Sequence, residues 1–574
     1  MPAPAWESTV AGGWSSRSIL RMDGQHKQTF ELSRGRLLAV LSLFAVAFVL
    51  IGARLVGLAA FSGPVGGRQA SVDSGLPVAG AARGQTRADI VDRNGIILAT
   101  DLTVMSAYAD PRRILDAPDA ALRLAAVMTD IDVAAMARRL ASKKHFVWVR
   151  RKLDPGLYKA VNDLGIPGIE FISENRRVYP QGRLAAHAVG FVDLDNRGLA
   201  GLERRFDGPL SAEASGPGFV TALDIRVQHA VHDVLSAGLQ RFHARAAIGL
   251  VADVDSGAIL AIVSLPDFDP AKAGQASRAA LFNHASLGVY EMGSTFKTFT
   301  VAMALEDGVA SLSSRYDASR PLHVARFTIR DDHPLGRVLT VPEIYIHSSN
   351  IGSARMALDV GAPAQREFLD KIGLLRPAAI ELPEVGRPLL PARWRDIRLM
   401  TISYGHGLAV SPVQLISAIS AMVNGGIWRP ASLLVRGGAT VPGQRVISPR
   451  TSDSIRQLMR SAVLEGTGHQ ARAIGYRVGG KTGTAEKSVN GGYSDSADFS
   501  SFVGAFPMEA PRYAVFVAYD EPQGDAATSG FSGGGWTAAP GFREIVRRIA
   551  PIVGVRPGQM PTGARRASFS AAAR

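Results

Sequence analysis

A serine and a lysine three positions apart, Ser294 and Lys297, place the strongest constraint on this sequence. They follow Gly293 and open an apolar run, residues 298–305, that permits a helix. Residues i and i+3 share one helix face, with Cβ atoms about 5–6 Å apart, so the lysine amine can reach the serine oxygen. A serine at a helix N-terminus also lies where the helix dipole favours developing negative charge. The pair predicts a serine nucleophile beside an amine, but two common residues alone are a weak signal.

Two later motifs strengthen this prediction. They are Ser348-Ser349-Asn350 and Lys481-Thr482-Gly483-Thr484. Penicillin-binding proteins and class A β-lactamases carry Ser-x-x-Lys, Ser-Asp-Asn and Lys-Thr-Gly elements in this order. Here Ser349 stands in place of the aspartate. The chain therefore resembles the class B penicillin-binding proteins, and most closely the division-specific D,D-transpeptidases (FtsI type).

The resemblance implies a role for each catalytic residue. Ser294 is the nucleophile that forms an acyl-enzyme, and Lys297 is the base that takes its proton. Lys297 must be neutral to act, and burial or a neighbouring cation such as Lys481 would lower its pKa. Ser348 relays the proton to the leaving amine, and Asn350 orients Lys297 or holds the peptide backbone.

The Lys-Thr-Gly-Thr element is expected to bind the donor peptide. By resemblance Lys481, Thr482 and Thr484 receive the C-terminal carboxylate of that peptide. Gly483 would keep the strand bare, so that substrate can align along its edge. The resemblance also places the oxyanion hole at the backbone N–H groups of Ser294 and Thr484.

Composition excludes some other chemistries. The 574 residues include no cysteine, so no disulfide framework, thiolate nucleophile or thiolate metal site is available. The twelve histidines are scattered without a zinc signature, and we expect no metal and no cofactor. His187 and His406 are predicted to be structural. The net charge of +14 favours anionic partners or reflects abundant arginine, and no basic block has the aromatic residues typical of a nucleic-acid site.

The N-terminal segment predicts a membrane anchor. Residues 37–53 are uncharged and apolar, and the apolar character continues to residue 61, which is long enough for a spanning helix. The excess of Lys and Arg in residues 1–36 predicts a cytoplasmic tail. Residues 62–84, rich in Gly, Ser and Pro, are expected to form a flexible linker. The chain would then be a single-pass inner-membrane protein with a periplasmic catalytic domain.

Beyond the linker, the sequence predicts two domains. Residues 85–224 are expected to form an elongated non-catalytic pedestal, because the hairpin pattern around Asn94-Gly95 and a second segment, residues 176–203, resemble two family boxes. Residues 117–164 have helical periodicity. Residues 225–553 carry a helix, a strand hairpin, a helical insert, three strands and a last helix. This order is typical of an α+β fold, an antiparallel sheet flanked by helices, as in the penicillin-binding transpeptidases. The tail, residues 554–574, is expected to be disordered.

Several alternatives compete with a transpeptidase. Residues 475–482 satisfy the P-loop pattern G-x-x-x-x-G-K-[ST], but a glycine-rich loop follows instead of a helix. A β-lactamase or a carboxypeptidase uses the same three motifs, yet it would not need the anchor and pedestal. A catalytically silent division scaffold would not need to retain all of the catalytic residues.

We therefore expect a peptidoglycan D,D-transpeptidase that cross-links stem peptides at the division septum and is inhibited by β-lactams. An elongation-specific class B transpeptidase is the alternative within the family. By resemblance, the partners are peptidoglycan stem peptides, an FtsW-like glycosyltransferase and other division proteins, with no nucleic acid.

Overall fold

The computed structural model describes residues 86–212, 218–324, 327–435, 442–489 and 492–558, with a few positions between 42 and 49. The predicted cytoplasmic tail (1–36) and linker (62–84) lie outside these residues, as do most of the predicted anchor (37–61) and the C-terminal tail beyond residue 558. Within the described part of the chain, no helix is long and apolar enough to cross a membrane. The chain divides into two units, residues 1–81 and 82–574, and all elements below belong to the second.

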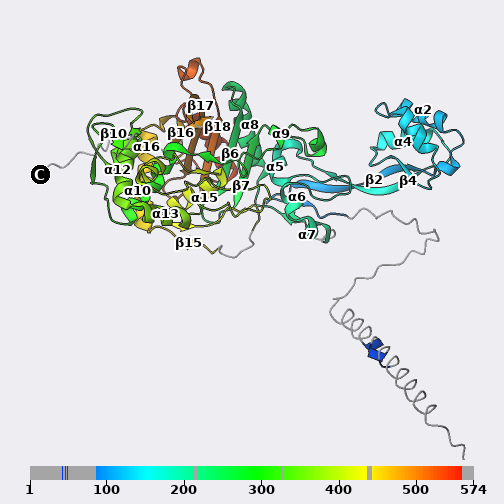
Figure 1. The fold of residues 1–574 in the computed structure, drawn as a ribbon, viewed down its shortest axis with the longest axis horizontal. Coiled ribbons are helices and arrows are strands. Elements are labelled where there is room, and N and C mark those ends of the chain that lie inside the picture. The colour runs from blue at the N-terminus through cyan, green and yellow to red at the C-terminus, as the bar shows by residue number, and fades with distance from the viewer. Residues whose placement is uncertain are drawn as a thin grey trace, which may run out of the picture. The chain divides into compact units, whose positions relative to one another are not determined.

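A five-stranded antiparallel sheet forms the centre of the larger domain (Figure 1). Its strand order is β16-β17-β18-β6-β7, which brings the last three strands of the chain beside an early hairpin. The strands are β6 (Ala246–Asp253), β7 (Ile259–Leu265), β16 (Gly479–Val489), β17 (Gly492–Phe506) and β18 (Tyr513–Asp520). All eight residues of β18 are buried because helices cover both faces of this central strand. The predicted α+β sheet is confirmed, and β16 lies at its edge.

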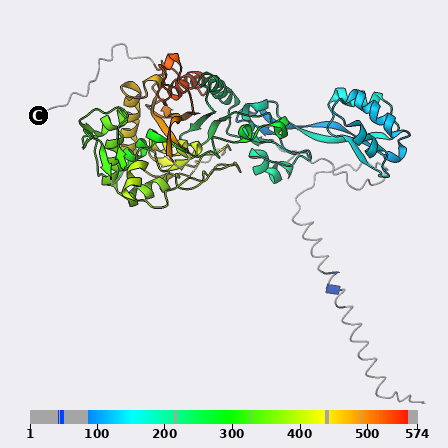
Figure 2. The ribbon, with the colours of Figure 1, turned by 45° about the horizontal axis from the view of Figure 1, so that its top comes forward.

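Helices cover both faces of this sheet (Figures 1 and 2). Helices α8 (Ile225–Arg241) and α17 (Ala538–Ile552) lie side by side on one face, and their apolar residues form a core with the strands. Asp224 caps the N-terminus of α8 through the N–H of Arg226. On the other face lie α15 (Pro412–Val423) and α16 (Pro449–Leu464), together with α10 (Lys297–Glu306), around a second, larger core.

The insert between β7 and β16 is mostly helical and carries the first two motifs. Its remaining elements are η3 (Pro270–Gln275), α9 (Arg278–Leu281), β8 (Tyr290–Glu291), η4 (Gly293–Phe296), β9 (Arg315–Asp317), β10 (Leu322–Val324), β11 (Phe327–Ile329), β12 (Val338–Thr340), α11 (Val341–Ile346), α12 (Asn350–Val360), α13 (Ala362–Lys371), α14 (Asp396–Ile402), β13 (Ala409–Val410), β14 (Ile427–Trp428) and β15 (Gln444–Arg445). The short 3-10 helix η5 (His469–Ala471) ends the insert, and another, η6 (Ala526–Thr528), lies between β18 and α17.

The pedestal has a sheet of its own, built on the long strands β2 and β4. Its strands are β1 (Ile90–Val91), β2 (Ile97–Ala109), β3 (Val147–Arg150), β4 (Ile169–Val178) and β5 (Phe219–Val220). Its helices are η1 (Pro111–Arg113), α2 (Ala117–Val127), α3 (Val133–Leu140), α4 (Pro155–Asp163), η2 (Gly182–Ala185), α5 (Ala186–Val189), α6 (Gly201–Arg205) and α7 (Asp207–Ala212). The predicted hairpin around residue 94 is confirmed. The continuous helical periodicity predicted for residues 117–164 is wrong in part, because β3 interrupts it and pairs with β2.

Buried charges hold the base of the pedestal together. Arg87 is fully buried and binds Glu203 at 2.8 Å, and Glu203 also accepts a hydrogen bond from Arg177 at 2.6 Å. His187 is buried against Phe268, and its Nε2 lies 2.8 Å from the carbonyl oxygen of Ala280. Burial lowers the pKa of His187 to about 4. The segment resembling the second family box is therefore a scaffold, as predicted, and not a reactive centre.

The described chain continues slightly past the predicted end of the catalytic domain. Val555 is buried in the core between the sheet and α17, and the N–H of Gly558 donates to the carbonyl oxygen of Gly475. The predicted tail thus begins with ordered contacts as far as residue 558.

Candidate active site

The turn that carries the predicted nucleophile, residues 292–296 with η4, is packed directly on the edge strand β16; it is called the nucleophile turn below. Gly293 has φ +52, and a Cβ there would lie 2.3 Å from the carbonyl oxygen of Thr484. Only glycine permits so close an approach at a positive φ. The 3-10 turn η4 follows at once and leads into α10, which sets Ser294 beside the Lys-Thr-Gly-Thr element, as the motif order predicts.

Four of the predicted catalytic residues meet around one amine. Lys297 Nζ lies 2.6 Å from Ser294 Oγ and 3.2 Å from Ser348 Oγ. It also donates to Asn350 Oδ1 at 2.6 Å. Ser294 lies in η4 and Lys297 is the first residue of α10, whereas Asn350 is the first residue of α12 and Ser348 lies in the turn before it. The proposed nucleophile and base are thus within hydrogen-bond distance, the geometry that activation of a serine needs.

The fifth residue, Lys481, reaches the site from β16. Its Nζ donates to Ser348 Oγ at 3.0 Å and to Thr482 Oγ1 at 3.3 Å. Ser348 therefore bridges the two lysines. Its backbone has φ +62, a left-handed conformation that costs a residue with a side chain on the order of 1–3 kcal/mol. A residue keeps such an unfavourable backbone conformation only where the surrounding structure fixes it, as the two lysines and the start of α12 do for Ser348.

Both lysines are fully buried, and burial changes their proton affinity. Burial lowers the pKa of Lys297 to about 7, although the carboxylates of Asp332 and Asp331 oppose the shift. Burial also places the pKa of Lys481 well below its usual range, and the charge of Lys297 lowers it further. A desolvated amine that loses its proton near neutral pH is suited to general-base catalysis. Of the two causes expected for a lowered Lys297 pKa, burial is the one that acts here, and the charge of Lys481 is not among the causes of this shift.

The predicted substrate-binding residues lie on the edge strand β16, where Thr482 and Gly483 are buried. Thr484 is exposed, and its Oγ1 accepts a hydrogen bond from the N–H of Gly534 at 3.1 Å. Thr482 Oγ1 lies 2.8 Å from Thr467 Oγ1. Because residues 481–484 are paired with β17 in a strand and do not open a helix, the P-loop alternative is excluded.

The structure gives a reason for Gly483 that the sequence did not predict. A Cβ at this position would lie 2.4 Å from Ser501 Oγ and 2.6 Å from the carbonyl oxygen of Met292. The packing of residues 292–295 against β16 therefore requires glycine here, whatever its part in aligning a substrate.

Sequence reasoning missed several neighbours of the site. Asp331 accepts hydrogen bonds from Ser349 Oγ and the N–H of Ile351, and Tyr404 places its ring 5.8 Å from Lys297 Nζ. Tyr404 lies in the segment of residues 403–407, which also resembles the family, so the sequence held a signal for it. Asp331 has no such signal, because nothing in its spacing relates it to Ser349.

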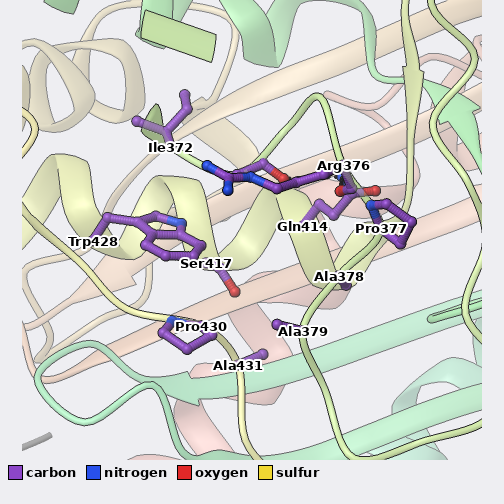
Figure 3. Close-up of a pocket in the computed structure, with 11 residues that line it drawn as sticks. Ile372, Arg376, Pro377, Ala378, Ala379, Gln414, Ser417, Trp428, Pro430 and Ala431 are labelled. Carbon is purple, nitrogen blue, oxygen red and sulfur yellow. Dashed lines mark hydrogen bonds between the residues drawn. The ribbon is translucent and has the colours of Figure 1, made fainter. Parts of the chain in front are cut away.

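One small cavity lies in another part of the catalytic domain (Figure 3). It is lined mainly by apolar groups from the loop after α13, from α15 and from the residues around Trp428. None of the eight predicted site residues lines it, so the cavity is not part of the proposed active site.

Comparisons with known proteins agree with this geometry. The family model for the penicillin-binding protein transpeptidase domain matches residues 247–547, and the model for the penicillin-binding protein dimerisation domain matches residues 82–216. The chain belongs to the penicillin-binding proteins. Its order of a dimerisation domain followed by a transpeptidase domain is the class B architecture.

Relatives and solved structures resemble this penicillin-binding protein along most of its length. It is 38% identical to a probable peptidoglycan D,D-transpeptidase FtsI of Caulobacter vibrioides, over 96% of this chain and 94% of the relative. It is 32% identical to a probable peptidoglycan D,D-transpeptidase PenA of Neisseria meningitidis serogroup A, over 83% and 86% of the two chains. The transpeptidase domain of penicillin-binding protein 3 from Burkholderia pseudomallei is 32% identical with a TM-score of 0.54, covering 60% of this chain and all of that one. Penicillin-binding protein 3 of Mycobacterium tuberculosis, complexed with aztreonam, shares the fold at 23% identity and a TM-score of 0.65, over 83% and 98% of the chains.

Proposed function

We propose that this penicillin-binding protein is a peptidoglycan D,D-transpeptidase that acts through an acyl-enzyme on Ser294. The observation that carries the proposal is the contact of Ser294 Oγ with the buried amine of Lys297 at 2.6 Å. Ser348 joins this amine to that of Lys481. The names of the relatives support the substrate class, since both are described as peptidoglycan D,D-transpeptidases.

The reaction follows from the positions of these groups. Ser294 Oγ forms a bond to the carbonyl carbon of the penultimate D-alanine as its proton passes to neutral Lys297. The C–N bond to the terminal D-alanine then breaks, and Ser348 relays the proton to the leaving amine. An amine of a neighbouring stem peptide then forms a bond to the ester carbonyl carbon and gives a proton to neutral Lys297. The C–O bond to Ser294 breaks, and Ser294 Oγ takes that proton, which restores the serine and completes the cross-link. The N–H groups of Ser294 and Thr484 would stabilise the oxyanion in both steps.

The donor peptide would lie along β16. This strand is the edge of the sheet, so an extended peptide can align beside it. Lys481, Thr482 and Thr484 would receive the terminal carboxylate, which an ammonium and two hydroxyl groups can bind. A β-lactam would acylate Ser294 as a mimic of this donor.

Labelling with a fluorescent penicillin tests the nucleophile. Wild-type protein should retain one covalent label after denaturation, and Ser294→Ala should retain none. Ser313→Ala, which removes an exposed hydroxyl after α10, is the matched control and should label like wild type. A persistent label in Ser294→Ala would refute the assignment. Absence of label in wild type would favour a silent scaffold.

We further propose that the protein acts at the division septum, as the FtsI name of the Caulobacter vibrioides relative suggests. It would be anchored in the inner membrane by residues 37–61, with the N-terminus in the cytoplasm and the catalytic domain in the periplasm. An FtsW-like glycosyltransferase and other division proteins would be its partners. Depletion in the native organism should then give filamentous cells, whereas round cells would indicate the elongation role.

A further inference from the structure

Asp331, which lies outside the three motifs, binds the second motif, Ser348-Ser349-Asn350, through hydrogen bonds that are called the clamp below. Asp331 lies in the segment between β11 and β12. Its Oδ2 accepts a hydrogen bond from Ser349 Oγ at 2.8 Å, and its Oδ1 accepts one from the N–H of Ile351 at 2.9 Å. Ser349 is also the N-cap of α12, because its Oγ accepts the N–H of Gly352 at 3.0 Å. One aspartate thus binds both the cap and the first turn of the helix that begins at Asn350.

Arg330, the residue before Asp331, fixes the side-chain amide of Asn350. The carbonyl oxygen of Arg330 accepts a hydrogen bond from Asn350 Nδ2 at 2.9 Å. With the amide nitrogen held there, Asn350 Oδ1 faces Lys297 Nζ at 2.6 Å. Residues 330–331 therefore bind Ser349, Asn350 and Ile351 directly after Ser348. Ser348 is the residue with φ +62 that lies between the two lysines.

Asp331 also brings a carboxylate next to the position where the second motif lacks one. Related enzymes carry an aspartate at the centre of their Ser-Asp-Asn element, where this chain has Ser349. Here Asp331 brings a carboxylate to Ser349 from a segment 18 residues earlier in the chain.

We propose that Asp331 is a positioning residue for acylation, which holds Ser348 and Asn350 in the geometry that serves Lys297. The inference rests on the proposed acyl-enzyme function and adds a residue to it. Asp331 does not touch the substrate; it acts through the turn. Because a misplacement of about 1 Å in a catalytic group costs about 10²-fold in rate, loss of the clamp should slow acylation by about ten- to a hundredfold.

The charge of Asp331 gives the proposal a second readout. Charged or titratable groups face Lys297 from three sides. They are Lys481 on β16, Asp331 and Asp332 between β11 and β12, and the ring of Tyr404. Both carboxylates favour the ammonium form of Lys297 and so raise its pKa against the effect of burial. Removing one of them should move the acidic limb of the acylation profile to lower pH, because neutral Lys297 then persists further into acid.

The test compares Asp331→Asn with a matched variant, Asp317→Asn. Asp317 also accepts hydrogen bonds from a serine hydroxyl and a backbone N–H, at 2.6 and 2.9 Å, but both belong to nearby Ser319. Acylation by a fluorescent penicillin is measured from pH 5 to pH 9 on folded protein. Asp331→Asn should show a lower rate at high pH together with an acidic limb at lower pH. Asp317→Asn should match wild type in both.

The outcomes separate this inference from the proposed function. If wild type is labelled at Ser294 and Asp331→Asn has the wild-type rate and profile, the inference alone is overturned. If wild type is not labelled, the proposed function itself fails. If Asp331→Asn does not fold, Ser349→Ala is the second variant, because it removes the hydroxyl that Asp331 binds. A reduced acylation rate at high pH in Ser349→Ala supports the clamp. A wild-type rate overturns it.

Discussion

Adding one methyl group at Gly293 should lower the acylation rate by more than its effect on stability explains. In Gly293→Ala the new Cβ would lie 2.3 Å from the carbonyl oxygen of Thr484, whereas ordinary contacts begin at 3.4 Å. Neither partner is a flexible side chain, so the nucleophile turn and β16 must separate by about 1 Å. A displacement of this size in a catalytic group costs about 10²-fold in rate. We therefore expect the second-order rate constant for acylation by a fluorescent penicillin to fall about a hundredfold.

A second glycine provides the matched control. Gly308 follows the same helix, α10, and has φ +71, but a Cβ there would meet nothing within 4 Å. Gly308→Ala and Gly293→Ala therefore share the cost of a side chain at positive φ, about 1–2 kcal/mol. Only Gly293→Ala has the clash. Gly308→Ala should lose stability in urea unfolding while acylating at the wild-type rate.

The result that would refute this reasoning is a wild-type acylation rate in Gly293→Ala. That outcome would mean that the contact between the nucleophile turn and β16 does not set the position of Ser294. A rate loss in Gly308→Ala of the same size would also contradict it, because backbone strain alone would then explain the effect.

Three further predictions concern charge. The acylation rate should rise with pH to a midpoint near 7, because Lys297 must be neutral and its pKa is lowered to about 7; a rate that stays flat down to pH 5 in stopped-flow labelling would contradict this. Asn350→Asp places a carboxylate beside Lys297 Nζ and should move that midpoint up by about 1–3 pH units, as an adjacent opposite charge does; an unchanged midpoint would exclude the contact. Arg87→Met leaves the buried carboxylate of Glu203 with Arg177 as its remaining arginine partner, and should cost about 3 kcal/mol in urea unfolding, the lower end of the range for breaking a buried ion pair. Lys159→Ala, at an exposed ion pair, should leave the unfolding midpoint unchanged.

Elements with strong local signals were predictable from the sequence. Helix α8 has a capping aspartate and a regular apolar face, and the strands of the β6–β7 hairpin are continuous apolar runs around a glycine turn. The candidate catalytic residues were equally predictable, because each of the three motifs lies within a few consecutive residues. The predicted helical stretch in the pedestal failed at β3, whose four residues depend on pairing with β2, a contact that no local pattern encodes.

Long-range contacts were not predictable in the same way. The clamp of Asp331 on Ser349 joins residues that share no motif and no periodicity. The loop predicted after the Lys-Thr-Gly-Thr element is instead the end of a hairpin, since β16 continues to residue 489 and β17 begins at residue 492. Pairing with a neighbouring strand overrides the weak strand propensity of Gly, Ser and Asn.

Backbone-on-backbone packing explains how segments so far apart in sequence converge. A Cβ at Gly405 would lie 2.0 Å from the carbonyl oxygen of Gly293, and one at Gly483 would lie 2.6 Å from that of Met292. The nucleophile turn is therefore enclosed between β16 and the turn after α14, with no side chains as spacers. This closeness buries the amines of Lys297 and Lys481 completely, and their burial lowers both pKa values. The motifs point to Gly293 and Gly483, but only the fold shows that Gly405 joins them in a contact of backbone on backbone that lets the amines be buried.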